Sequence, residues 1–390
     1  MISLVIEDFN RLALQVKISK SSEENGFYED IHKETIMNNL DKTKVDAFST
    51  KMLDILNGSM LSLMIGIGYQ TGLFEVMANL PPSTSEQIAP VAELKERYVR
   101  EWLAAMVAGQ IVDYDPTTNN YSLSAEYASV LTRVAGPNNM ARLTLVIPFL
   151  ASVQKDIVDS FHKGGGVSYS AYPDFMNLWS EINAERFDAT ITQIVLPLMP
   201  DVVENMRQGV DVLDIGCGDG HVLKLMAKAF PNSRFTGYDF LENGIDAARA
   251  KAKSLGLTNV NLEAKDITTF QETNKYALIT AFDAIHDMAQ PAKVLKSIAD
   301  SLKPDGTFLM VDLGASSNLH ENLDHPLGPW LYTTSCMHCM TVSLGQNGAG
   351  LGAMWGEQKA VKMLNEAGFI NVDVKQISED IFNNYYIAKK

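Results

Sequence analysis

The sequence has few cysteines and lacks a long uninterrupted apolar run. Its cysteines are Cys217, Cys336 and Cys339. Three cysteines cannot form a disulfide framework, so we expect free thiols. No segment approaches the ~18 uninterrupted apolar residues of a membrane span, and the first residues, MISLVIEDFN, lack a basic start and a small-residue cleavage site. We expect a cytoplasmic protein with no membrane partner.

Positive charge is also scarce. The 390 residues include 32 Lys and Arg against 47 Asp and Glu, a formal net charge of −15. Such a chain repels polyanions unless a local basic patch overrides the overall field, and the sequence has no dense patch. Nucleic acid is therefore not an expected partner. A hydrophobic content of 46% with 20% charged residues predicts a globular protein with two cores or more.

The front of the chain divides into two parts. Residues 1–46 mix charged and apolar positions, and we expect an N-terminal extension with weak helices. Within residues 47–135 one helical stripe is formed by six apolar residues: Leu53, Leu56, Met60, Leu63, Met64 and Ile67. A short helix ending near Val91, a helix over 93–109 and two short strands in IVDYDPTTNNYSLS follow. Helices followed by a hairpin predict a winged-helix-like domain.

Many winged helices bind DNA, and the charges of the expected recognition helix test that function. Contacts to several phosphates require an excess of positive charge. The helix over 93–109 has no excess, because three basic residues face three acidic ones: Lys95, Arg97 and Arg100 against Glu93, Glu96 and Glu101. Dimerisation or packing is the favoured role for this domain. A DNA-binding regulator stays as the alternative.

The rest of the chain predicts an α/β fold behind a helical segment. Residues 136–200 are mostly helical in pattern, and we expect a connector that covers the substrate side of a pocket. From Gly209 apolar strand-like runs alternate with helical segments to the end of the sequence. This alternation predicts a parallel sheet covered by helices, with its ligand at the carboxyl ends of the strands.

The stretch VLDIGCGDGH carries the chemistry of that ligand. Gly216, Gly218 and Gly220 would let the backbone approach a ligand closely. A dinucleotide loop needs a glycine where His221 stands, and the Asp214 carboxylate would repel a pyrophosphate. Further aspartates end the next expected strands, where they could accept ribose hydroxyls, meet an amine or face a cation: Asp239, Asp266 and Asp283. S-adenosylmethionine, an adenosine with positive charge and no phosphate, fits such a pocket.

These residues resemble the class I S-adenosylmethionine-dependent methyltransferases. VLDIGCGDG is similar to the first motif of that family, YDF to its ribose acid, KDI to its adenine contact and LKPDGTFLMVD to its fifth strand. The resemblance implies a Rossmann-like seven-stranded domain over residues 201–390. GYQTGLFEVM and LKERYVREWLAAMVAGQIV add a similarity to a group known from mycobacteria, related in plan to small-molecule O-methyltransferases. That group implies a homodimer formed through the winged-helix-like domain.

The resemblance implies a role for each cofactor residue. Asp214, Gly216 and Gly218 would hold the methionine end, Asp239 and Phe240 the ribose and adenine edge, Asp266 and Ile267 the adenine, and Phe282 and Asp283 the region of the sulfonium. The alternative for each aspartate is a cap or turn residue at a strand end. The expected reaction transfers a methyl group to O, N or S of a small molecule and leaves S-adenosylhomocysteine. A transcriptional regulator that senses S-adenosylmethionine and a non-catalytic scaffold are the alternatives.

Methyl transfer needs an aligned acceptor and a group that removes its proton. His286, just past the fourth expected strand, and His338 are the candidate bases. Cys336, His338 and Cys339 suggest zinc, but no fourth ligand stands nearby, so no metal is expected. The acceptor pocket would lie between the Rossmann-like domain and the helical connector. Its candidate substrate contacts are Tyr172, Trp179, Asp287, Trp330 and Met337.

Overall fold

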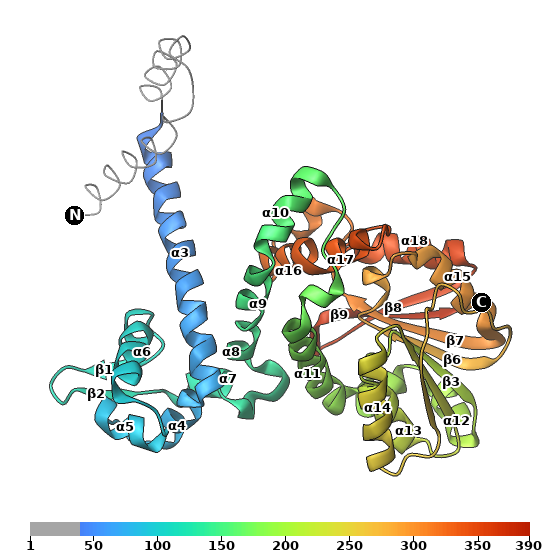
Figure 1. Ribbon diagram of the computed structural model, residues 1–390, viewed down its shortest axis with the longest axis horizontal. Helices are drawn as coiled ribbons and strands as arrows, with labels where there is room; N and C mark the ends of the chain where they lie inside the picture. The colour runs from blue at the N-terminus through green and yellow to red at the C-terminus, as the bar shows by residue number, and fades with distance from the viewer. Residues whose placement is uncertain (1–39) are drawn as a thin grey trace, which may run out of the picture. The chain divides into compact units, whose positions relative to one another are not determined.

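A computed structural model describes residues 40–390 of the chain (Figure 1), except the side chains of residues 173–176 and of Asn243. The predicted extension over residues 1–46 lies almost entirely outside the described residues. By contacts the chain forms two compact units, residues 1–61 and residues 62–390. Helix α3 (Lys42–Thr71) runs through the end of the first unit and into the second.

Helix α3 has an unusually exposed apolar surface. Among the described helices it is the one that is long and apolar enough to cross a bilayer by length and composition, with a mean hydropathy of 1.3 over its best window and 11% of that window buried. Polar residues interrupt it, so no uninterrupted apolar span exists. Leu56 is 56% exposed and Met60 is 66% exposed. The predicted helix is present, and most of the apolar residues of its stripe are exposed.

The winged-helix pattern is confirmed. Helices α4 (Leu73–Asn79), α5 (Ser85–Val91) and α6 (Glu96–Ala108) precede the antiparallel pair β1 (Asp113–Asp115) and β2 (Asn120–Ser122). Phe74 and Trp102 pack edge to face at 5.2 Å in its core. The backbone of α3 touches this pair at Gly68, where a Cβ atom would lie 2.5 Å from the Trp102 ring. Glycine is therefore required there for close packing.

Helix α7 (Ala125–Leu131) follows the strand pair, within the residues predicted as the winged-helix-like domain. The residues predicted as a connector, 136–200, contain α8 (Met140–Leu143), α9 (Val146–Ser152), α10 (Gln154–Lys163) and α11 (Pro173–Thr190). A 3₁₀ turn over Tyr169–Ala171 precedes α11, and a π-helical turn over Ile191–Val195 follows it. Gly166 lies so close to the backbone of Thr341 and Gly345 that no side chain would fit. The glycine run before α11 is thus held against the second half of the chain.

The second half forms the predicted α/β domain around a seven-stranded sheet in the order β5-β4-β3-β6-β7-β9-β8. The strands are β3 (Asp211–Ile215), β4 (Arg234–Asp239), β5 (Val260–Ala264), β6 (Tyr276–Phe282), β7 (Leu302–Leu313), β8 (Asn371–Ile377) and β9 (Asp380–Lys389). The first five pair in parallel, and β9 lies antiparallel between β7 and β8. The strand order reverses between β3 and β6, which is where such sheets bind ligands.

Helices cover both faces of this sheet (Figure 1). Helices α12 (Pro200–Gln208), α13 (His221–Ala229) and α14 (Glu242–Ser254) pack on one face, and α15 (Pro291–Ser301) and α18 (Gly356–Ala367) on the other. Successive residues of β7 point to opposite cores, since Leu309 belongs to the first and Met310 to the second. Helix α16 (Gly328–Thr334), a π-helical turn over Ser335–Cys339 and α17 (Met340–Gly345) follow β7.

Candidate active site

A cavity of about 580 Å³ opens at the carboxyl ends of the central strands. This volume suits a small-molecule ligand. The structure brings all nine predicted cofactor residues to its wall: Asp214, Gly216, Gly218, Asp239, Phe240, Asp266, Ile267, Phe282 and Asp283. Six aspartates line the cavity, and no lysine or arginine of the described chain does. The cavity wall is therefore strongly acidic.

The glycine loop after β3 follows the cavity with its backbone. Gly216 and Gly218 have φ values of +67° and +54°, in the left-handed region that favours glycine. A Cβ atom on Gly216 would also lie 2.7 Å from the Cβ of Ala284. Gly220 leads directly into α13. The loop thus presents backbone rather than side chains to a ligand, as the sequence predicts for a close approach.

Asp214 lies at the buried end of the cavity. Its Oδ1 accepts a hydrogen bond from the hydroxyl of Thr280 at 2.7 Å, and the residue is 2% exposed. Burial raises the pKa of this carboxyl to about 7, against the lowering effect of the Thr280 hydroxyl. A cation bound in the cavity would favour the ionised form.

Asp239 supports the loop as well as the cavity. Its carboxylate accepts hydrogen bonds from the backbone N–H of Gly218 at 2.9 Å and of Leu241 at 3.0 Å. Burial raises its pKa, while these two N–H donors oppose the rise. The next residue, Phe240, is half exposed and packs its ring 5.3 Å from that of Tyr169. The strand end therefore offers both a carboxylate and an aromatic face.

Asp266 lies two residues beyond the end of β5. It is exposed, and its Oδ1 accepts from both the N–H and the hydroxyl of Thr268. The turn function considered for the strand-end aspartates is therefore present here, although Asp266 also lines the cavity. Ile267 beside it is buried. Both residues lie where the adenine edge of a ligand was expected.

Asp283 directly follows β6 in a left-handed conformation, with φ of +49°. Its Oδ2 accepts from the Asn183 side-chain amide at 3.1 Å, and Arg186 lies 3.8 Å away. Burial raises the pKa of the carboxyl to about 7, and the Arg186 charge opposes this. A non-glycine residue in this conformation is held by its surroundings, and such strain concentrates at functional sites.

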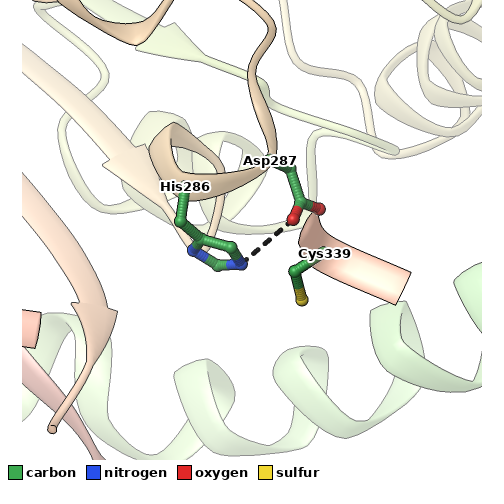
Figure 2. A group of neighbouring side chains, drawn as sticks. All are labelled: His286, Asp287 and Cys339. Atoms are coloured by element: carbon green, nitrogen blue, oxygen red, sulfur yellow. Dashed lines mark ion pairs between the residues drawn. The ribbon is translucent and has the colours of Figure 1, made fainter. Parts of the chain in front are cut away.

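His286 is buried between two carboxylates rather than exposed to solvent. Its Nδ1 lies 2.8 Å from Oδ1 of Asp312, and its Nε2 lies 3.2 Å from Oδ1 of Asp287. Figure 2 shows the ring edge directed at Asp287. Burial alone would lower the pKa of His286, but Asp312 and Asp287 raise it well above its usual value. Asp312 is itself fixed by the Trp355 indole N–H at 3.1 Å.

Asp287 is the member of this group that reaches the cavity, since it lines the cavity and His286 does not. Its Oδ2 accepts from the phenol of Tyr169 at 2.9 Å. Burial and the Asp287 charge raise the pKa of Tyr169 well above its usual value, so the phenol stays protonated. A proton from a bound acceptor would therefore meet the Asp287 carboxylate first, with His286 and Asp312 behind it.

Cys339 is the third member of the group in Figure 2. One donor atom from each of His286, Asp287 and Cys339 lies within 4.8 Å of the others, which is the kind of nitrogen, oxygen and sulfur set that could hold a metal ion. Burial raises the pKa of the Cys339 thiol to about 12. Cys336 and His338 do not belong to this set. The suspected cluster in SCMHC is thus divided by the fold, and all three cysteines of the chain are free.

The other predicted substrate and base residues fall into two groups. Trp179 lines the cavity, and its ring stacks on that of Trp330 at 6.0 Å. Four residues do not line the cavity and pack nearby instead: Tyr172, Trp330, Met337 and His338. The Tyr172 phenol donates to the Met337 carbonyl at 2.6 Å, and its ring meets that of His338 edge to face. Burial lowers the pKa of His338 to about 4, so its imidazole is neutral.

Sequence reasoning missed several residues that build the site. Tyr169, Asn183 and Arg186 come from the connector, far in sequence from the strand ends that they contact. Thr280 points from the middle strand to Asp214. Thr280 could have been found from the sequence, because it lies in a predictable strand next to the strand that ends near Asp214. The connector residues had no local signal.

Comparison with known proteins agrees with this geometry. A model of the Rv2258c-like winged HTH domain matches residues 59–133. A model of a methyltransferase domain matches residues 206–368. The chain joins a winged helix domain to a methyltransferase domain. The second match contains the glycine loop and every aspartate of the cavity.

The chain is also similar to individual proteins. (S)-coclaurine N-methyltransferase of Papaver somniferum is 36% identical over 105 residues, which are 27% of this chain and 30% of that protein. The chain thus spans about a third of that relative. The fold is similar to that of mitomycin 7-O-methyltransferase MmcR, with a TM-score of 0.63, 17% identity, and coverage of 90% and 100% of the two chains. Human N-acetylserotonin methyltransferase, solved with SAM, has a TM-score of 0.57 and 16% identity, with coverage of 87% and 97%.

Proposed function

We propose that this protein transfers a methyl group from S-adenosylmethionine to O, N or S of a small molecule and releases S-adenosylhomocysteine. The observation that carries the proposal is the acidic wall of the cavity, with six aspartates and no lysine or arginine among the described residues. Such a wall attracts the sulfonium and ammonium of S-adenosylmethionine and repels the pyrophosphate of a dinucleotide. Human N-acetylserotonin methyltransferase, which shares the fold, was solved with SAM.

The residues present fit this cofactor. Asp214 would pair with the ammonium, because its carboxyl is buried and gains from a cation. Asp239 and Phe240 would face the ribose and the adenine edge, and Asp266 and Ile267 the adenine, where the end of β5 meets the cavity. Bound S-adenosylmethionine supplies an activated methyl group. The glycine loop lets the backbone of Gly216 and Gly218 approach it.

The acceptor would enter on the side of Tyr169 and Trp179. Asp287 faces this side and forms a coupled unit with His286 and Asp312, whose three groups carry a net negative charge when the imidazole is protonated. The unit can take the acceptor proton at the Asp287 carboxylate, which His286 and the Tyr169 phenol hold in place. Alignment of acceptor and donor then supplies most of the rate.

The proposal is tested by two measurements on the purified chain. Calorimetry with S-adenosylmethionine should show binding, and Asp214→Asn should weaken it at pH 8. Incubation with a panel of phenols, amines and thiols should release S-adenosylhomocysteine for at least one class. Binding without release for any class would leave a scaffold, and tight NAD binding with no S-adenosylmethionine binding would refute the cofactor assignment.

We infer that two copies of the chain pair through residues 47–135 and that the connector over 136–200 covers the acceptor side of the 201–390 domain. The exposed apolar face of α3 supports pairing, since large apolar patches mark interaction surfaces. Helix α6 has no excess of positive charge for contacts to DNA phosphates. The free thiols at Cys217, Cys336 and Cys339 suit a reducing compartment, which agrees with a cytoplasmic location.

A further inference from the structure

Arg186 is a buried cation close to the cavity but outside its lining. It belongs to helix α11 and is 4% exposed. Its Nη1 lies 3.8 Å from Oδ2 of Asp283, its Nε lies 3.6 Å from Oδ1 of Asp380, and its guanidinium lies 5.1 Å from the centre of the Phe382 ring. Three elements that are distant in sequence therefore meet at this one charge.

The partner carboxylates differ in how firmly they are held. Asp380, at the start of β9, accepts from the Tyr385 phenol at 2.7 Å and from the Asn383 amide at 2.9 Å, so its position is fixed by its own strand. Asp283 has one hydrogen-bond donor, Asn183, among the described residues, and its Oδ1 has none. Asp380 thus anchors Arg186, and Arg186 acts on Asp283.

We propose that Arg186 is a positioning residue that favours the charged form of Asp283 at the cavity wall, so that Asp283 can recognise the positive charge of the cofactor. This rests on the proposed function. An unpaired carboxylate in a buried site takes up a proton. Arg186 opposes that uptake without entering the cavity, which leaves the cavity free of competing cations.

The other charges around Asp283 define what Arg186 must overcome. Asp312 of β7 and Asp380 of β9 favour the protonated carboxyl, and His286 favours the ionised one. Arg186 is the stronger of the two favourable charges. Its removal should therefore shift the balance of the whole group towards a neutral Asp283.

The test measures S-adenosylmethionine affinity by calorimetry between pH 6.5 and pH 8.5 in the full chain. Arg186→Met should weaken binding relative to the unmodified protein on the order of tenfold at pH 6.5 and less than about twofold at pH 8.5, because loss of the Arg186 charge raises the pKa of Asp283 further. At the higher pH Asp283 is ionised with or without Arg186. Arg186→Lys keeps the charge and should follow the unmodified protein more closely.

Two further variants separate charge from structure. Arg142→Met removes another buried arginine. Arg142 lies in α8 and pairs with Glu185 of α11 at 2.7 Å, and its loss should leave the pH dependence unchanged. Asp283→Asn removes the carboxyl on which Arg186 is proposed to act, so Arg186→Met should cause no further pH-dependent loss of affinity in that background. Thermal melts show which variants fold. If Arg186→Met does not fold, Arg186→Lys and Asp283→Asn still test the inference.

The outcomes are distinct. A constant weakening of Arg186→Met at every pH, or the same pH-dependent loss when Asp283→Asn is already present, would mean that Arg186 acts through packing and would overturn the inference. If the unmodified protein failed to bind S-adenosylmethionine at any pH, the proposed function itself would fail instead.

Discussion

We expect the affinity for S-adenosylmethionine to fall as the pH drops from 8 to 6, with Asp214 responsible for a defined share. The carboxyls of Asp214 and Asp283 both have a pKa of about 7 because they are buried. A bound cation favours the ionised form, so binding must expel a proton wherever the free carboxyl holds one. The pKa is raised in the free protein and lowered in the complex, so affinity is lost as the pH falls through about 7.

The size of the effect follows from this value. One carboxyl with a pKa of about 7 that must ionise on binding weakens affinity about tenfold between pH 8 and pH 6, and two such carboxyls about a hundredfold. Asp214→Asn should reduce the dependence to about tenfold, because Asp283 alone still titrates. Calorimetry in buffers of different ionisation enthalpy counts the protons released on binding.

Thr280 provides a matched control for this argument. Its hydroxyl donates to Asp214 and favours the ionised carboxyl. Thr280→Val keeps the shape, removes that donor and should move the pH dependence to higher pH, while Thr280→Ser should preserve it. If binding were independent of pH, or if Asp214→Asn kept the full dependence of the unmodified protein, the assignment of Asp214 to a cationic part of the cofactor would be wrong.

Three further predictions concern the base, the phenol and the dimer. Asp287→Asn should lower kcat on the order of 10²- to 10⁴-fold with little change in cofactor affinity, because its carboxylate is the proposed proton acceptor and a general base contributes that much; an unchanged kcat in steady-state assays would exclude the base role. Tyr169→Phe removes the donor to Asp287 and should lower kcat/KM on the order of tenfold, as for a hydrogen bond to a charged group, and kinetics equal to those of the unmodified protein would show that the phenol is idle. Leu56→Glu with Met60→Glu should turn a dimer into a monomer in analytical ultracentrifugation, whereas a monomer in the unmodified protein would contradict pairing through α3.

Residues with a local pattern could be predicted, and residues placed by tertiary packing could not. The glycine loop and the aspartates at strand ends follow from β/α alternation, since parallel strands bring their carboxyl ends to one edge. His286 and Asp287 belong to the same strand end. Arg186 and Tyr169 enter the site only because the connector packs over that edge, and nothing near them in the sequence marks a charge or a phenol as functional.

On the acceptor side, the sequence suggested pocket residues that do not line the cavity. His338 and Met337 stand beside two cysteines, and their composition suggested a pocket wall. The π-helical turn over Ser335–Cys339 directs Cys339 to His286 while His338 packs against Tyr172. Residue types alone do not reveal which way such a turn points its side chains, because one extra residue in the turn rotates all that follow.

The position of β9 has a consequence for the order in which the protein can be made. This strand is synthesised after β8, yet it lies between β7 and β8 in the sheet. β9 must therefore be synthesised before β7 and β8 can belong to one sheet, and until then β8 has no strand to pair with. Asp380 arrives with the same strand, so a nascent chain that stalled before it would leave Arg186 without its anchor.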